Sequence, residues 1–137
     1  MNELQLKLCD IQGRLFELSA DNAYESASFV KIFMVSEIAK ALDSTYNRMQ
    51  WAGEEYLLEE LAAVSGDKLR KEGEIFAKDI LYWMGYLYRY WHYYTNEDSA
   101  KIYKQAPVRT MKRNYLMFHT MAPELAIDNL KEIYENR

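Results

Sequence analysis

Hydrophobic residues recur at helical spacing from the beginning of the chain. Leu4, Leu8, Ile11, Leu15 and Leu18 follow one another every three or four residues, which is the period of one face of an amphipathic helix. Residues 2–19 are therefore predicted to form the first helix. The small polar residues of SADNAYES, residues 19–26, interrupt the pattern and predict a turn.

The same spacing resumes after each polar interruption. It predicts a second helix from Ser26 to about Asp43, and further helices over residues 44–64, 68–94, 99–106, 108–119 and 123–136. Asp43 or Ser44 is a candidate cap for the helix that follows, and Pro123 suits the first turn of the last helix, where its missing N–H costs nothing. With only 5 Gly and 2 Pro, long loops are not expected. The predicted fold is all-α: a single-domain bundle of five to seven helices over residues 1–137, with a long aromatic helix at its centre.

That long helix carries the stretch YWMGYLYRYWHYY, residues 82–94, in which eight of thirteen residues are Tyr or Trp. An advance of 100° per residue places Phe76, Ile80, Trp83, Leu87, Tyr90 and Tyr94 on one face. We interpret this face as the core stripe and expect Trp83 and Leu87 to be almost fully buried. Tyr82, Tyr86, Arg89 and Tyr93 fall on the opposite face. Either other helices cover that face too, or it binds a partner, since Tyr and Arg are enriched at binding hot spots.

Net charge argues against nucleic acid as the partner. The formal charge is −4, whereas non-specific nucleic-acid binding usually accompanies positive charge. One basic run is nevertheless a candidate phosphate-contacting patch, with an ordinary solvated face as the alternative: Lys101, Lys104, Arg109, Lys112 and Arg113.

The sequence has no stretch of about 18 apolar residues, so no membrane span is predicted. The single cysteine, Cys9, lies in an apolar helical pattern and is expected to be a buried small hydrophobe, so we expect a cytoplasmic protein.

The sequence contains no recognisable catalytic or cofactor-binding motif. His92 and His119 are 27 residues apart and lack metal-site spacing, and no glycine-rich phosphate loop or nucleophile elbow occurs. The densest acidic group, Glu54, Glu55, Glu59 and Glu60, is interpreted as a solvated face. We therefore expect a non-enzymatic protein with no catalytic residue, metal or cofactor. A helical enzyme with an unrecognised carboxylate site stays an alternative.

Three segments together resemble a family of small all-helical antitoxin-like proteins of bacterial, mainly Gram-positive, toxin–antitoxin systems. They are residues 28–61, 82–107 and 111–133, and the most distinctive pieces are YRYW at 88–91 and NYLMFHT at 114–120. The resemblance implies neutralisation of a cognate toxin, encoded by a neighbouring gene, by direct binding. It implies an ADP-ribosyltransferase-like toxin as the candidate partner, and it carries no catalytic residues.

Three functional hypotheses follow. The leading one is an antitoxin-like interaction protein whose partner-binding residues are Tyr82, Tyr86, Arg89 and Tyr93, with a homodimer as a further option. The second is a nucleic-acid-binding regulator, although the chain lacks an evident DNA-binding segment, and the helix predicted after Pro123 is too acidic to read a major groove. The third is the helical enzyme, which predicts a polar pocket that holds several carboxylates and a metal.

Overall fold

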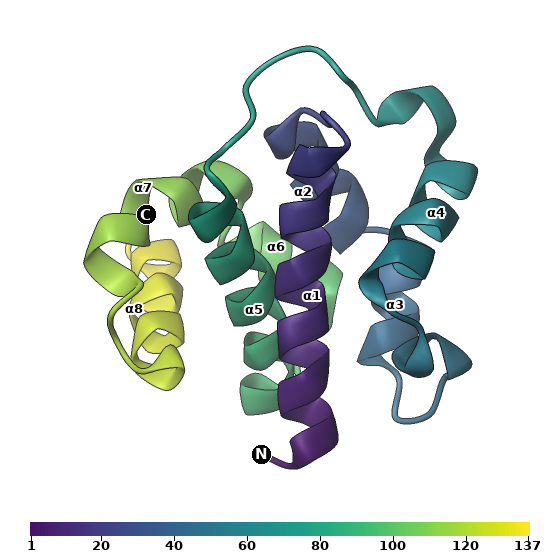
Figure 1. The fold of residues 1–137 in the computed structure, drawn as a ribbon. Helices are drawn as coiled ribbons and strands as arrows, with labels where there is room; N and C mark the ends of the chain where they lie inside the picture. Colours follow the sequence, from purple (N-terminus) through teal and green to yellow (C-terminus); the bar gives the residue numbers. More distant parts are fainter.

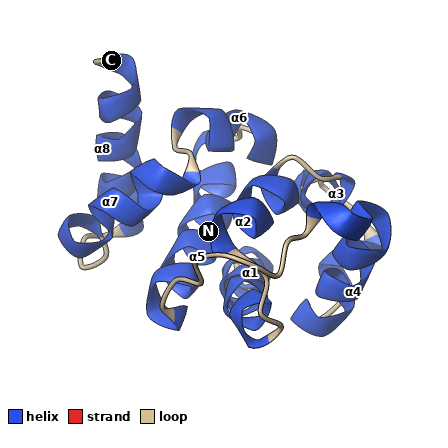
Figure 2. Ribbon diagram, turned by 90° about the horizontal axis from the view of Figure 1, so that it is seen from above, coloured by secondary structure: helices blue, strands red, loops and turns tan.

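The computed structural model describes residues 1–137 and consists of helices and connecting loops, with no strand (Figure 2). The eight α-helices are α1 (Glu3–Asp21), α2 (Ser26–Met34), α3 (Glu37–Asp43), α4 (Glu54–Ser65), α5 (Lys78–Thr95), α6 (Ser99–Gln105), α7 (Val108–Phe118) and α8 (Pro123–Glu135). Two short 3-10 helices, η1 (Arg48–Trp51) and η2 (Gly66–Lys68), flank α4. The predicted all-α class is confirmed, but the number of α-helices is eight rather than five to seven.

The long helices α1 and α5 run side by side and make the most extensive contact between any two elements (Figure 1). Helices α3 and α4 lie on one side of this pair, whereas α7 and α8 lie on the other side, next to α5 (Figure 1). Helices α2 and α6 pack against each other, and α6 also contacts α5. As a result, α5 contacts α1, α6, α7 and α8.

Two glycines allow α1 and α5 to approach closely. A Cβ atom on Gly85 of α5 would overlap the Gln12 carbonyl oxygen and come within 2.9 Å of the Gly13 Cα atom of α1. A Cβ atom on Gly13 would lie 2.7 Å from the ring of Tyr82. At the same crossing, the Gln12 side-chain amide donates a hydrogen bond of 2.9 Å to the Gly85 carbonyl oxygen. The absence of side chains at these two positions therefore sets the spacing of the α1–α5 pair.

Two predicted helices are interrupted in the structure. The segment 26–43 divides into α2 and α3, because Ser36 caps α3 with its hydroxyl, which accepts a hydrogen bond of 3.2 Å from the Ala39 N–H. The segment 44–64 is α-helical only from Glu54 onwards. Asn47 caps η1, so neither Asp43 nor Ser44 caps the element that follows, and the predicted cap is wrong.

The predicted helix 68–94 is too long at its N-terminal end, because α5 begins at Lys78. Residues 69–77 instead cross the beginning of α2, where the first N–H groups of a helix lack partners within the helix. The carbonyl oxygens of Arg70 and Glu74 accept hydrogen bonds from the N–H groups of Glu25 and Ser26, at 2.7 and 3.0 Å. The Ser26 hydroxyl in turn accepts a bond of 2.9 Å from the Phe76 N–H. The extended segment over residues 69–77 therefore satisfies the N–H groups of Glu25 and Ser26. A helix over the same residues would not satisfy them.

The buried face of α5 is displaced from the predicted stripe. Leu87 is 2% exposed, as expected, but Trp83 is only half-buried, so the prediction that it is almost fully buried is wrong. The face is displaced because α1 covers the side of α5 around Gly85, while α6 covers another side, where the Tyr88 hydroxyl donates a hydrogen bond of 2.6 Å to the Ala106 carbonyl oxygen. The buried side chains of α5 are Leu81, Met84, Leu87, Tyr88, Arg89, Trp91 and His92.

Aromatic side chains from three helices occupy the middle of the core. The ring of Phe16 in α1 packs edge-on against Phe29 and Phe33 of α2, with ring centroids 5.3 and 5.5 Å apart, and lies 6.3 Å from the ring of Tyr88.

Cys9 is fully buried, which confirms the sequence expectation, and burial raises the pKa of its thiol to about 12. No helix combines the length and the apolar character that crossing a membrane requires.

Candidate functional site

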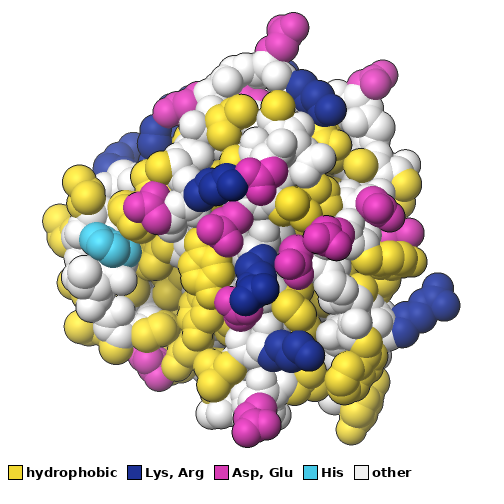
Figure 3. All heavy atoms as spheres, viewed as in Figure 1, with side chains coloured by type: hydrophobic (Ala, Val, Ile, Leu, Met, Phe, Trp, Pro, Cys, Tyr) yellow, Lys and Arg dark blue, Asp and Glu magenta, His cyan; other side chains and the backbone are white.

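A groove of about 310 Å³ lies between α5, α7 and the turn that joins α7 to α8. We call it the aromatic groove, and its lining residues are Tyr82, Trp83, Tyr86, Leu87, Tyr115, His119, Met121 and Pro123. Figure 3 shows hydrophobic side chains gathered on the part of the surface that α7 and α8 form and along their border with α5. The groove therefore contains part of the YWMGYLYRYWHYY stretch.

One wall of the groove includes Tyr82 and Tyr86, which belong to a row of three tyrosines on α5. Tyr82, Tyr86 and Tyr90 are four residues apart, so their rings follow one another along one face, with centroids separated by 6.0 and 6.2 Å. The outer two are anchored by carboxylates of neighbouring helices: the Tyr82 hydroxyl donates to Asp10 at 2.5 Å, and the Tyr90 hydroxyl donates to Glu124 at 2.7 Å. Burial and these hydrogen bonds raise the pKa of Tyr82, and raise that of Tyr90 to about 12. Both rings therefore stay neutral and fixed at physiological pH.

Tyr86, between them, has a hydroxyl group that makes no hydrogen bond within the protein. The group is not among the fully buried polar atoms, so water satisfies it in the free protein. Tyr86 therefore presents both a half-buried ring and a free hydroxyl to any molecule that enters the groove.

The opposite wall comes from α7. The ring of Tyr115 packs edge-on against Trp83, with centroids 5.5 Å apart, and stacks on His119 at 4.3 Å. The Tyr115 hydroxyl also donates a hydrogen bond of 3.2 Å to Asp79 of α5. These contacts fix the rings before any partner arrives, which lowers the entropic cost of binding.

Apolar side chains of α7 and α8 are strongly exposed. Leu116 and Met117 of α7 expose 82% and 66% of their surface, and Leu125 of α8 exposes 51%. Single exposed apolar residues are ordinary, but several of them on helices that also line a groove of aromatic rings are typical of an interaction site.

The structure separates the four residues predicted to bind a partner. Tyr82 and Tyr86 line the aromatic groove, and both are half-buried. Tyr93 lines a different depression, together with His92 and residues of the α1 N-terminus. Arg89 is 0% exposed, so the expectation that it lies on a binding surface is wrong. Its position on the helix was assigned correctly, but α1, α3 and α6 cover that position.

Arg89 holds four helices together by hydrogen bonds. Its Nη1 atom pairs with Asp43 at the end of α3 at 2.6 Å, and its Nε atom donates to Gln12 of α1 at 2.8 Å. Its Nη2 atom donates to the Ser99 hydroxyl at the beginning of α6 at 3.2 Å. Asp43 also accepts from the Ser99 backbone N–H at 2.8 Å, so this carboxylate caps α6 from another element. The group is a structural cluster, and all of its buried polar atoms have partners.

The basic run does not form one patch. Arg109, Lys112 and Arg113 line a depression on α7 that also contains Glu25 and Glu74. Lys112 already pairs with Glu74 at 2.6 Å. Lys101 and Lys104 lie on α6, outside that depression, and Lys101 lies 3.5 Å from Glu97. The interleaved carboxylates reduce the positive potential that a phosphate-binding surface needs.

No group of three or more His, Cys, Asp or Glu side chains is arranged to hold a metal ion. Of the four carboxylates of α4, Glu55 and Glu59 are exposed, whereas Glu54 and Glu60 are half-buried. His92 is buried, and its Nδ1 atom lies 2.6 Å from the Glu97 carbonyl oxygen. His119 lies in the aromatic groove, where it stacks on Tyr115.

A second polar cluster attaches α8 to the end of α5. Glu97 accepts hydrogen bonds from Lys131 of α8 at 2.7 Å, from the Trp91 indole N–H at 2.9 Å and from the Gln105 amide at 2.9 Å. Burial opposes ionisation of Glu97, but these hydrogen bonds outweigh it and lower its pKa to about 2. The cluster matters for the groove because α8 begins at Pro123, a groove residue.

Acidification is expected to weaken this attachment. Because the pKa of Glu97 is lower in the folded chain than in the unfolded chain, its contribution is fully present above about pH 5 and is lost as the pH falls towards 2. Partial solvent screening reduces that contribution to on the order of 1–2 kcal/mol. The free energies of unfolding in urea of the wild type and of Glu97→Gln should differ by about this amount at pH 6. The two values should converge near pH 2. A difference in the free energy of unfolding that does not depend on pH would contradict a stabilising role for the ionised Glu97 carboxylate.

Comparisons with known proteins identify no relative: no family model matches the chain, and neither a curated protein nor a solved structure matches it. Function must therefore be inferred from the groove and from the sequence.

Of the eight residues that line the groove, the sequence predicts only Tyr82 and Tyr86 as site residues. Helical spacing places Trp83 and Leu87 in the core stripe, and it gives no site role to Tyr115, His119, Met121 or Pro123. The segment 114–120 was noted as distinctive, but sequence periodicity cannot show that α7 packs beside the Tyr82–Tyr86 face of α5.

Proposed function

We propose that the protein is a non-enzymatic, antitoxin-like interaction protein that neutralises a toxin by direct binding in the bacterial cytoplasm. The observation that carries the proposal is the aromatic groove, whose Tyr82 and Tyr115 rings are held in place by Asp10 and Asp79 while the Tyr86 hydroxyl stays free. Rigid aromatic side chains provide a large contact area at low entropic cost, as binding hot spots do. The resemblance of residues 82–107 and 111–133 to antitoxin-like proteins supports the same proposal, with an ADP-ribosyltransferase-like toxin as the partner.

In this proposal α5 is the central framework of the molecule. Its contacts with α1, α6, α7 and α8 support that role, because they fix the direction of the tyrosine row. The sole cysteine is buried and unpaired, which suits a reducing compartment. A nucleic-acid-binding role has less support, because the basic residues are divided between two helices and interrupted by Glu25 and Glu74.

The direct test is a calorimetric titration of the chain with the protein encoded by the adjacent gene. Tyr86→Ala is expected to weaken binding by at least about 30-fold, the scale of a hot-spot residue, and to leave the thermal melt nearly unchanged. Its matched control is Tyr46→Ala, which removes a ring that is 92% exposed and lies outside the groove.

Binding that is equally strong for the wild type and Tyr86→Ala would reject the groove as the contact surface. If the wild type does not bind the adjacent gene product, the proposed antitoxin role itself fails.

A further inference from the structure

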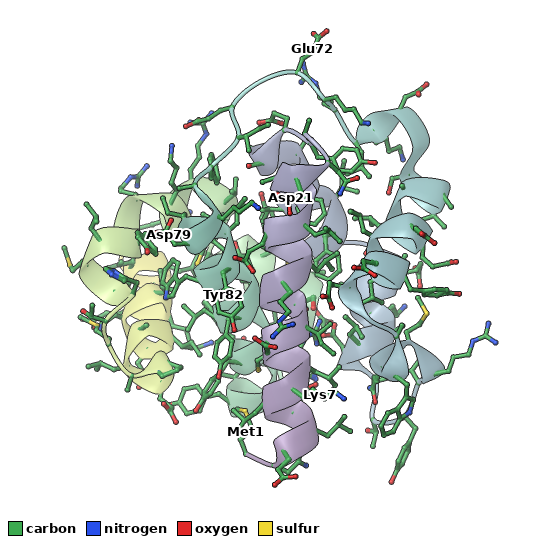
Figure 4. All side chains as sticks on the ribbon, viewed as in Figure 1. Met1, Lys7, Asp21, Glu72, Asp79 and Tyr82 are labelled. Carbon is green, nitrogen blue, oxygen red and sulfur yellow. The ribbon has the colours of Figure 1, made fainter.

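A second depression, of about 490 Å³, adjoins the aromatic groove. Tyr82 lines both: one side of its ring faces the groove, and its hydroxyl reaches Asp10 in the second depression. Figure 4 shows Tyr82 beside α1, on the same face of the molecule as Asp21. We call this feature the acidic depression, and its lining residues are Asp10, Arg14, Glu17, Leu18, Asp21, Glu54, Lys78 and Tyr82.

The acidic depression carries an excess of negative charge. Its lining includes four carboxylates and two cations, so its formal charge is −2. Both cations are already engaged, because Arg14 pairs with Asp10 at 2.9 Å and Lys78 pairs with Asp21. Glu17 of α1 and Glu54 of α4 are half-buried, and neither makes an ion pair or a side-chain hydrogen bond. Two carboxylates are therefore left without a partner next to an apolar groove.

We propose that the aromatic groove and the acidic depression together bind one segment of a partner protein that carries a large apolar side chain and, within a few residues of it, a lysine or arginine. The apolar side chain packs between Trp83, Tyr86 and Tyr115, and the basic side chain pairs with Glu17 and Glu54. This inference rests on the proposed function, because it describes the part of the partner that occupies the groove.

Charge complementarity selects this occupant over others. Glu17 and Glu54 repel an acidic segment or a phosphate backbone, and such like-charge contacts exclude wrong partners as effectively as favourable contacts select the right one. The carboxylates that anchor the rings have the same sign: Asp79 holds Tyr115 and Glu124 holds Tyr90. A basic, apolar segment would therefore meet carboxylates beside the groove as well as in the acidic depression.

The test uses a display library of random 16-residue peptides as the probe. The library is panned on the full-length chain at low salt, with soluble Tyr86→Ala protein present to remove peptides that bind elsewhere. Recovered peptides are expected to be enriched in Lys or Arg within four residues of Phe, Trp or Leu. Affinity for the best peptide should fall at least tenfold for Glu17→Gln/Glu54→Gln, and should fall as salt rises from about 50 to about 200 mM.

The matched control is Glu59→Gln/Glu135→Gln. It removes the same net charge from two exposed carboxylates outside the acidic depression, so affinity should change less than about twofold, because distant exposed charges are screened. Thermal melts of both double variants verify that the chain is folded.

Four results would overturn the inference. Recovered peptides without an excess of basic residues, or with an affinity that Glu17→Gln/Glu54→Gln leaves unchanged, would show that the acidic depression does not select the occupant. Recovery of no groove-dependent peptide would also reject it. Self-association of the chain that Glu17→Gln/Glu54→Gln abolishes would assign the surface to a second copy instead. The proposed function is judged separately, by the titration with the adjacent gene product, so the two failures are distinguishable.

Discussion

Replacing Arg89 by alanine is expected to lower the free energy of unfolding by about 3–5 kcal/mol, the usual cost of removing one partner of a buried ion pair. Arg89 is 0% exposed, and its guanidinium group joins Asp43, Gln12 and Ser99. Truncation leaves the Asp43 carboxylate, whose side chain is 9% exposed, with a buried negative charge and without its guanidinium partner. Urea unfolding monitored by circular dichroism measures the change.

Arg14→Ala is the control for this prediction. Arg14 also pairs with an aspartate, at 2.9 Å, but its side chain is 58% exposed, so the same substitution should cost less than about 1 kcal/mol. If Arg89→Ala and Arg14→Ala unfold at the same urea concentration, the buried cluster does not stabilise the fold. One practical consequence follows: binding experiments on the tyrosine row should keep Arg89 intact, because its loss changes folding rather than the contact surface.

Gly85→Ala is expected to destabilise the chain by more than about 3 kcal/mol or to prevent folding, which exceeds the usual cost of overpacking a core. The reason is that the added methyl group meets the backbone of Gln12 and Gly13, and backbone atoms cannot move aside as the end of a side chain can. Helices α1 and α5 would have to separate, which would break the Gln12–Gly85 hydrogen bond.

The control substitution is Gly53→Ala. Gly53 immediately precedes α4, and a Cβ atom there would meet no atom within 4 Å. Its replacement should cost less than about 1 kcal/mol, from the poorer capping of α4 alone. A Gly85→Ala protein as stable as Gly53→Ala would contradict the close α1–α5 crossing.

Helices were predicted well where local signals dominate. Pro123 begins α8, as predicted, and α6, α7 and α8 lie close to the predicted ranges 99–106, 108–119 and 123–136. The errors occur where a distant element supplies the decisive contact. Within residues 69–77, Gly73 is a local signal against helix, and its φ is +125°. The unsatisfied N–H groups at the beginning of α2 then hold the segment extended.

The candidate site was predictable only in part for the same reason. Helical spacing placed Tyr82 and Tyr86 together on one face, and the structure keeps them together in the groove. The same spacing placed Arg89 with them, but periodicity along one helix cannot show that Gln12, Asp43 and Ser99 converge on that position from three other helices.

The central claim, that a partner protein binds in the aromatic groove, can be tested by one NMR measurement on the ¹⁵N-labelled chain. Its three tryptophans report three regions: Trp83 lines the groove, Trp51 is 75% exposed on η1, and Trp91 is buried with its indole N–H bonded to Glu97. Addition of the adjacent gene product should shift or broaden the Trp83 indole N–H signal and leave the Trp51 and Trp91 signals in place. A shift of the Trp51 signal with Trp83 unchanged would place the partner on the η1 side of the molecule and contradict the account.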